Sequence, residues 1–128
     1  MTNIPMIRVL IKEVDEPLRE AMIPASLESY YNTIDCDYIE IIYPFQEDYP
    51  PIIGIIDDEG RLKRKLISWR CDYYGGINGT IIFARDDGMG NTVSLTDDDV
   101  AYIKSRCAYA HYATNKDDFD CSFQIYSW

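Results

Sequence analysis

Two stretches of this chain bring together residue types that can do chemistry: a basic, aromatic segment and a set of aspartates. Residues 61–70 hold five cations and no acid, and Trp69, Tyr73 and Tyr74 lie within or just after them. Arginine and aromatic side chains together can stack a base and bind a phosphate. The same residue types are typical of protein–protein interfaces, and a polar loop beside a buried tryptophan is a third interpretation. The cations are Arg61, Lys63, Arg64, Lys65 and Arg70.

The aspartates form the second candidate set. The chain of 128 residues has a net charge of -10, and outside the basic segment it carries 7 basic residues against 22 acidic ones. If these carboxylates share one face, they can imitate DNA phosphates and occupy the basic groove of a nucleic-acid-binding protein. The alternative is a solvated surface in which turn and cap aspartates do local structural work. The second half of the chain contains Asp86, Asp87, Asp97, Asp98, Asp99, Asp117, Asp118 and Asp120.

Motifs for catalysis or for metal and cofactor binding are missing from the sequence. There is no nucleophile elbow, phosphate-binding loop, zinc-protease motif or dinucleotide fingerprint. Cys107 and His111 have the i, i+4 spacing of two metal ligands, but His111 is the only histidine and the four cysteines form no C-x-x-C pair. We therefore expect no catalytic residue, no metal, no cofactor and no enzymatic activity.

Charge and hydropathy also restrict the partners and the compartment. An acidic chain repels nucleic acid and anionic membranes, so direct binding to either is not expected. No stretch approaches the ~18 apolar residues that span a membrane, and the N-terminus lacks a charged segment followed by an apolar run. Free thiols in a reducing cytosol explain the scattered cysteines. The sequence does not determine the oligomeric state.

Hydrophobic patterns place the secondary structure. Ser26 and Thr96 are predicted N-caps of two helices, with apolar residues at helical spacing after each. Strands alternate irregularly with these helices, and no linker divides the chain. This predicts a single α+β domain over residues 1–128, with a mostly antiparallel sheet of five or six strands and two helices on one face. The predicted strands are 6–13, 17–22, 37–43, 52–56, 79–85, 92–95 and an edge strand in 120–128.

Five segments in this order resemble a domain-of-unknown-function family of small bacteriophage and mobile-element proteins. They are MIRVLIKE (6–13), DYIEII (37–42), DDEGRLK (57–63), INGTIIFAR (77–85) and VSLTDDDV (93–100). The resemblance covers about residues 6–105 and leaves 106–128 as a C-terminal extension. It implies a phage or mobile-element setting in a bacterial cytosol, and it carries no activity, so no residue inherits a catalytic role. Where family members show a Pro-Asn-Arg-like segment, this chain has residues 67–74, ISWRCDYY.

Two functions follow as hypotheses. The first is a non-enzymatic accessory protein that binds and inhibits a host protein, as an acidic, DNA-mimic-like anti-defence factor. The alternative is a protein that binds or sequesters a nucleotide. The residues expected to bind the host protein are Asp86, Asp87, Asp97, Asp98, Asp99, Trp69, Tyr73 and Tyr74. The residues expected to line a nucleotide pocket are Arg64, Arg70, Trp69 and Tyr74.

Overall fold

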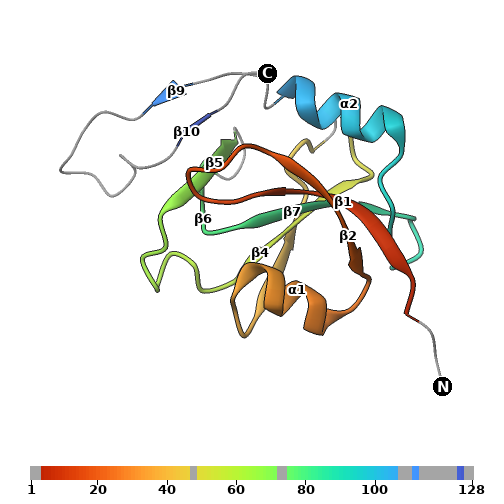
Figure 1. Ribbon diagram of the computed structural model, residues 1–128, viewed down its shortest axis with the longest axis horizontal. Coiled ribbons are helices and arrows are strands. Elements are labelled where there is room, and N and C mark those ends of the chain that lie inside the picture. The colour runs from red at the N-terminus through yellow and green to blue at the C-terminus, as the bar shows by residue number, and fades with distance from the viewer. Residues whose placement is uncertain (1–3, 47–48, 72–74, 107–110, 113–123, 126–128) are drawn as a thin grey trace.

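A computed structural model gives the arrangement of the chain (Figure 1). It describes residues 4–46, 49–71, 75–106, 111–112 and 124–125. The helices are α1 (Leu27–Ile34) and α2 (Asp97–Arg106). The strands are β1 (Met6–Lys12), β2 (Arg19–Pro24), β3 (Ile39–Ile42), β4 (Ile52–Asp57), β5 (Ile67–Cys71), β6 (Gly75–Asn78), β7 (Ile81–Asp86), β8 (Thr92–Val93), β9 (His111–Tyr112) and β10 (Gln124–Ile125).

A six-stranded sheet forms the centre of the fold. Its strands run in the order β2-β1-β7-β4-β3, and β8 pairs with the end of β7. Every pairing in it is antiparallel. The prediction of an α+β domain with a mostly antiparallel sheet is confirmed. The two edge strands, β2 and β3, are far apart in space, and β7 lies in the middle.

The central strands are apolar on both faces, which requires a layer on each side of the sheet. In β7, Ile81 and Phe83 face one core cluster, whereas Ile82 and Ala84 face the other. In β1, Leu10 belongs to the first cluster and its neighbours to the second. Since successive side chains of a strand point to opposite faces, these runs cannot be covered from one side only.

The helices lie on opposite faces of the sheet (Figure 1), and the expectation that both cover one face is wrong. On α1, Tyr30 and Ile34 pack into one cluster. On α2, Val100 and Ile103 pack into the other. The physical reason is the two-sided burial of β1, β4 and β7, which the sequence pattern of single strands did not distinguish from one-sided burial.

Both predicted helix caps are present. The Ser26 hydroxyl accepts a hydrogen bond from the Ser29 amide at 3.2 Å. Thr96 and Asp99 cap each other reciprocally: the Asp99 amide donates to Thr96 Oγ1 at 3.1 Å, and the Thr96 amide donates to Asp99 Oδ2 at 2.9 Å. This exchange satisfies two donors that a helix start leaves unpaired.

The hairpin of β5 and β6 covers the sheet face that also carries α2, and the sequence did not predict it. Its strands pair antiparallel with a shift in register between Ile67 and Trp69. Trp69 and Ile77 point into the core cluster of that face, where the Trp69 ring meets Phe83 edge-on at 5.2 Å between centroids. From the sequence, this segment could be a binding surface or a polar loop beside a buried tryptophan; the structure shows that Trp69 is buried and that it lies on a strand.

Part of the C-terminal prediction falls outside the described residues. The edge strand expected in 120–128 is represented by β10, which pairs antiparallel with β9. Cys107 and Ala110, which continue the helical spacing of Val100 and Ile103 in the sequence, lie outside the described part of the chain. Among the described residues, no helix is long and apolar enough to cross a membrane.

Gly60 holds the turn after β4 close to the end of β6, and we expect Gly60→Ala to destabilise the fold. A β-carbon at this position would lie 2.4 Å from the backbone oxygen of Asn78, which cannot move without displacing the hairpin. The expected loss is about 1–3 kcal/mol in the free energy of unfolding, measured by urea denaturation. Leu62→Ala, in the same loop but 83% exposed, is the control and should change it by less than about 0.5 kcal/mol. Equal effects of the two substitutions would contradict this account.

Candidate functional site

Asp86 and Asp87, predicted to bind a partner, build the turn between β7 and β8. Asp86 Oδ1 accepts a hydrogen bond from the Gly88 amide at 3.0 Å. Asp87 accepts hydrogen bonds from the amides of Met89 and Asn91 and from the Asn91 side chain. The Asn91 side chain and these amides lower the pKa of Asp87. Both carboxylates therefore have a local structural role of the kind that aspartates commonly take in turns.

The three aspartates of the first turn of α2 have different environments. Asp97 remains 95% exposed at its side chain while it binds Arg8 Nη1 at 2.6 Å. Asp98 is exposed. Asp99 is fully buried, and Arg85 Nη1 binds both of its oxygens, at 2.7 and 2.9 Å. Asp99 therefore does not belong to an exposed acidic surface, in contrast to the prediction.

The pKa of Asp99 is lowered despite its burial. Burial raises the pKa of the carboxyl. The hydrogen bonds from the Thr96 amide, the Arg85 guanidinium and the Tyr49 hydroxyl lower it by more than burial raises it, so that the pKa ends below its ordinary value. The result is a charged group that ties β7 to the start of α2. A buried carboxylate with an arginine and an amide as partners is typical of such a structural link.

The aromatic and arginine residues predicted to contact a partner or a nucleotide also differ in their environments. Trp69 is only 4% exposed and forms part of the core, so its ring is not available to stack on a base or to fill a partner's pocket. Tyr73 and Tyr74 lie outside the described residues. Arg64 is exposed, in a left-handed backbone conformation with φ of 56°. Arg70 is exposed on β5.

Two cations of the basic segment stabilise the fold through Asp57, at the end of β4. The Asp57 side chain is buried and binds Lys63 Nζ at 3.0 Å and Lys65 Nζ at 2.8 Å. It also accepts a hydrogen bond from the Glu59 amide at 2.8 Å. Burial raises the pKa of Asp57, but Lys65, the Glu59 amide and Lys63 lower it below its ordinary value of 3.8. Its hydrogen bond to Asp57 raises the pKa of Lys63.

Lys65 also connects this ion pair to two other elements. Its Nζ donates to the backbone oxygens of Ile34 and Asp35, at 3.2 and 2.7 Å. Ile34 is the last residue of α1, and Asp35 is its C-cap. A cation is favourable at this position because the carbonyl groups of a helix end carry partial negative charge. Its own backbone oxygen accepts a hydrogen bond from Asn78 Nδ2 at 2.8 Å. The lysines of the basic segment therefore hold α1, β4 and the hairpin together.

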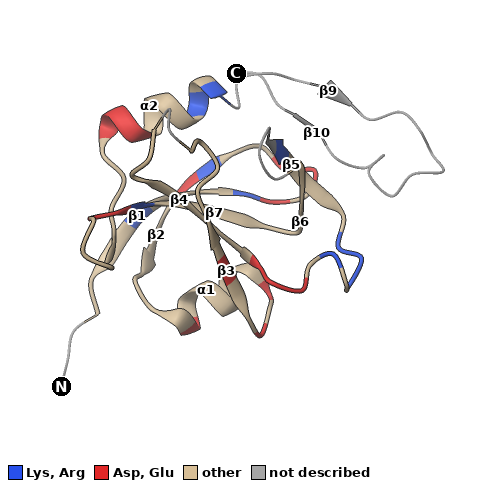
Figure 2. Cartoon of the chain, turned by 180° about the vertical axis from the view of Figure 1, so that it is seen from behind, with Lys and Arg blue, Asp and Glu red and all other residues tan. Residues whose placement is uncertain are grey.

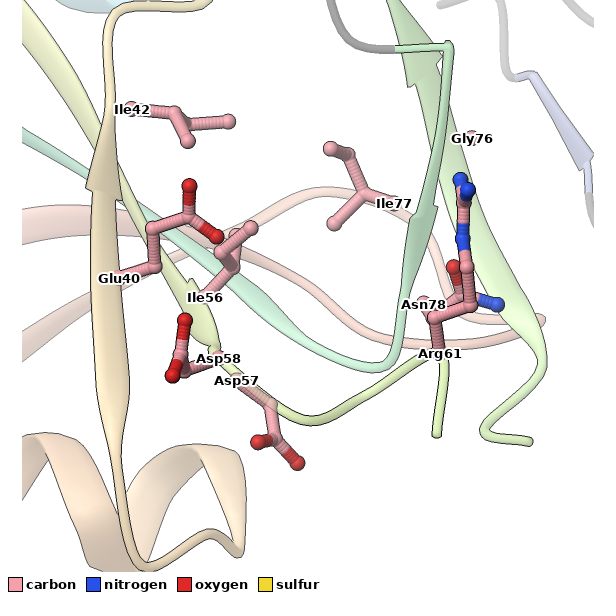
Figure 3. A pocket seen from close by; sticks show the side chains of 9 residues that line it. All are labelled: Glu40, Ile42, Ile56, Asp57, Asp58, Arg61, Gly76, Ile77 and Asn78. Atoms are coloured by element: carbon pink, nitrogen blue, oxygen red, sulfur yellow. The ribbon is translucent and has the colours of Figure 1, made fainter. Parts of the chain in front are cut away.

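A cleft opens between β3 and β4 on one side and the hairpin on the other (Figure 3). Its volume is about 170 Å³. Ile42, Ile56 and Ile77 form the apolar part of its lining, and the carboxylates of Glu40 and Asp58 lie together on the β3–β4 side. Arg61 lies on the opposite side, beside the hairpin. Asp57 also borders the cleft, but its carboxylate is directed to the two lysines described above.

The strand next to this cleft, β3, is an edge of the sheet. It pairs only with β4 among the strands that the structure describes. Glu40 and Ile41 are exposed on the strand, and Tyr38, just before it, is 62% exposed. Sequence reasoning singled out none of these residues. The segment 37–43 was predicted to be a strand, but nothing local indicated that it would lie at an edge.

The exposed charges are distributed over several places (Figure 2). Acidic residues colour the first turn of α2, the β3 strand and the turn after β4, whereas the basic residues of the β4–β5 loop project beside the last of these. The carboxylates therefore do not form a single row. In the described part of the chain, no three histidine, cysteine or acidic side chains are grouped so that they could hold a metal ion.

The fold and the site define a small α+β domain with an acidic cleft beside an open sheet edge. The chain belongs to the DUF3846 family: the family model, described as a domain of unknown function, matches residues 7–108. This match runs from β1 through α2 and confirms the expectation of an uncharacterised-domain family. Comparisons with the curated proteins and with the solved structures find no match.

Asp57→Asn should destabilise the protein at neutral pH and flatten its response to acid. Because the pKa of Asp57 is lowered in the folded state, its stabilising effect is present above the ordinary value and is lost as the pH falls through the folded value. We expect a loss of about 2–4 kcal/mol at pH 7, since two lysines lose their charged partner. In urea denaturation from about pH 6 to pH 2, the wild type should lose more stability than the variant.

Asp58→Asn is the matched control for this measurement, because Asp58 is the exposed neighbour of Asp57. It should leave both the stability at pH 7 and the acid response within about 0.5 kcal/mol of the wild type. Parallel pH profiles for the wild type and Asp57→Asn would show that the ion pair does not stabilise the fold.

Trp69→Ala tests whether this residue belongs to the core or to a binding surface. The buried ring packs on Phe45 and Phe83, so its removal should lower the free energy of unfolding by about 3–5 kcal/mol. Tyr38→Ala, which removes an exposed ring, should change it by less than about 0.5 kcal/mol. Thermal unfolding followed by circular dichroism measures both. A Trp69→Ala variant as stable as the wild type would rule out the core role.

Proposed function

We propose that this chain is a non-enzymatic accessory protein of a bacteriophage or mobile element that binds and inhibits a host protein in the bacterial cytosol. A defence component with a basic surface is the kind of target that fits it. The observation that carries the proposal is the pair of carboxylates, Glu40 and Asp58, at a cleft beside an open strand edge. This arrangement has the elements of a recognition surface: charge, apolar walls and a strand edge that is unpaired in the part of the chain that the structure describes.

The charge of the chain supports a basic partner. With a net charge of -10, its long-range field attracts cations and speeds their association, and it repels nucleic acid. Several acidic residues, Asp57 and Asp99 among them, are occupied by internal ion pairs. The exposed carboxylates that remain lie in separate groups (Figure 2), which favours contact with a basic patch over imitation of a long row of phosphates.

The volume of the cleft also bears on the choice of partner. At about 170 Å³ it is smaller than the ~300–1,000 Å³ of typical small-molecule sites. It has room for one long side chain of a protein rather than for a nucleotide. At this cleft, a macromolecular partner that inserts a side chain is therefore favoured over a free nucleotide.

Affinity capture with charge-reversed variants tests this function. The chain is immobilised, exposed to bacterial lysate at about 0.05 M salt and eluted at about 1 M, where screening is strong. We expect a specific host protein, identified by mass spectrometry, that is retained by the wild type and released by salt. Glu40→Lys combined with Asp58→Lys should abolish its retention, and the activity of the captured protein should fall when the purified chain is added.

Two further variants locate the surface. Asp15→Lys with Glu16→Lys reverses two exposed acids in the turn between β1 and β2, and should retain the host protein. Asp97→Lys with Asp98→Lys tests the acidic start of α2, and its effect measures how far this second group contributes. Retention that is insensitive to salt and to every reversal, or no retained protein at all, would contradict the proposed function.

A further inference from the structure

The outer edge of β3 presents backbone groups in a regular pattern. The Tyr38 carbonyl accepts a hydrogen bond from the Asp58 amide at 3.0 Å, which directs residue 38 toward β4. In an antiparallel pair, the residues that exchange hydrogen bonds with the partner strand alternate along the chain. Glu40 and Ile42 therefore also bond toward β4, opposite Ile56 and Gly54. The amide and carbonyl groups of Ile39 and Ile41 then point away from β4, to the outer edge.

This edge lacks the protection that the opposite edge has. Proteins commonly guard edge strands with charged residues, especially lysine, and with proline. The other edge, β2, contains Arg19 and Glu20 and ends at Pro24. By contrast, β3 has the sequence IEII, with Ile41 41% exposed and one charge, Glu40. A short open edge with an apolar residue is a site where an extended segment can add as a further strand.

The cleft is placed to receive a side chain of such a segment. Tyr38, Glu40 and Ile42 are on one face of β3, because alternate residues share a face. Glu40 and Ile42 line the cleft. The β-carbon of a residue directly opposite Glu40 on an added strand would lie about 4.5–5.5 Å from the β-carbon of Glu40. From there a long side chain can lie along the apolar wall and place its head near the two carboxylates (Figure 3).

The carboxylates of the cleft favour a basic side chain as its occupant. A lysine or arginine has an apolar stem that suits Ile42 and Ile56 and a cationic head that suits Glu40 and Asp58. A second copy of this chain is disfavoured, because pairing two β3 edges would bring Glu40 of both copies together between two molecules of net charge -10. An acidic segment would face the same carboxylates.

We propose that the outer edge of β3 binds an extended segment of a partner protein as an added strand, with a lysine or arginine of that segment in the cleft and its cationic head against Glu40 and Asp58. This inference rests on the proposed function, in that it names how the basic partner is recognised. Backbone hydrogen bonds at Ile39 and Ile41 supply affinity, and the cleft supplies selectivity for a basic side chain.

Titration of the ¹⁵N-labelled chain with synthetic peptides tests the inference. The probe is the capped peptide Thr-Val-Lys-Val-Thr-Val, and its control carries glutamate in place of lysine. The lysine peptide should shift the amide resonances of Ile39 and Ile41 and slow their hydrogen exchange. The glutamate peptide should bind at least ~10-fold more weakly, because it loses the charge-assisted contacts.

Variants distinguish the contribution of the β3 edge to peptide binding from that of the cleft carboxylates. Glu40→Gln with Asp58→Asn should weaken the lysine peptide about 10-fold and abolish the preference over glutamate. Ile41→Lys places a guarding charge on the edge and should weaken both peptides. Arg61→Glu should strengthen the lysine peptide, since it adds a carboxylate across the cleft. Asp15→Asn with Glu16→Gln, in the β1–β2 turn at the other end of the strand order, should change nothing.

Three results would overturn the inference: no binding at millimolar peptide, equal binding of the two peptides, or shifts that map away from β3. A host protein captured from lysate but insensitive to Glu40 and Asp58 reversal would leave the proposed function in place on another surface. Conversely, peptide binding at β3 without any captured host protein would support the edge site and contradict the proposed function.

Discussion

The buried carboxylate of Asp57 and its two lysine partners connect β4, the end of α1 and the loop that leads into the β5–β6 hairpin. Asp57 ends β4, and its two lysine partners come from the loop that leads into the β5–β6 hairpin. One of them, Lys65, also binds the carbonyl end of α1. A charge removed from water requires partners, and here the two lysines of one loop supply them while Lys65 links that loop to the end of α1. The position of the hairpin, and with it one wall of the cleft, therefore depends on this ion pair.

The same constraint explains why only some of the carboxylates of this chain are open to a partner. Asp57 and Asp99 are buried with cations, and Asp86 and Asp87 bind backbone amides of their own turn. These groups stabilise the fold. Glu40 and Asp58 are exposed at a cleft, so their charge is directed to solvent and to whatever binds there. The distinction between the two kinds of carboxylate decides which of them can recognise a partner.

The two-sided sheet has a related consequence for the edge strands. Because β1, β7 and β4 are buried on both faces, each face carries its own layer: α1 on one, α2 with the hairpin on the other. β3 is the last strand in the order, one of its faces borders the cleft, and its outer edge is unpaired among the described residues. A strand edge that is open among the described residues, next to a charged cleft, is a combination that suits recognition of an extended segment.

The sequence by itself determined the local features. Apolar runs located most strands, Ser26 and Thr96 marked the helix starts, and the ordered segments from residue 6 to residue 100 indicated the family. Each of these depends on neighbouring residues, so a linear pattern records it. Only the tertiary structure decided that the helices lie on opposite faces, that Trp69 is a core residue and Asp99 an internal ion-pair partner, and that Glu40 and Asp58 meet at a cleft. These outcomes depend on which strands become neighbours across long sequence separations, and that order is set by the packing of the whole chain.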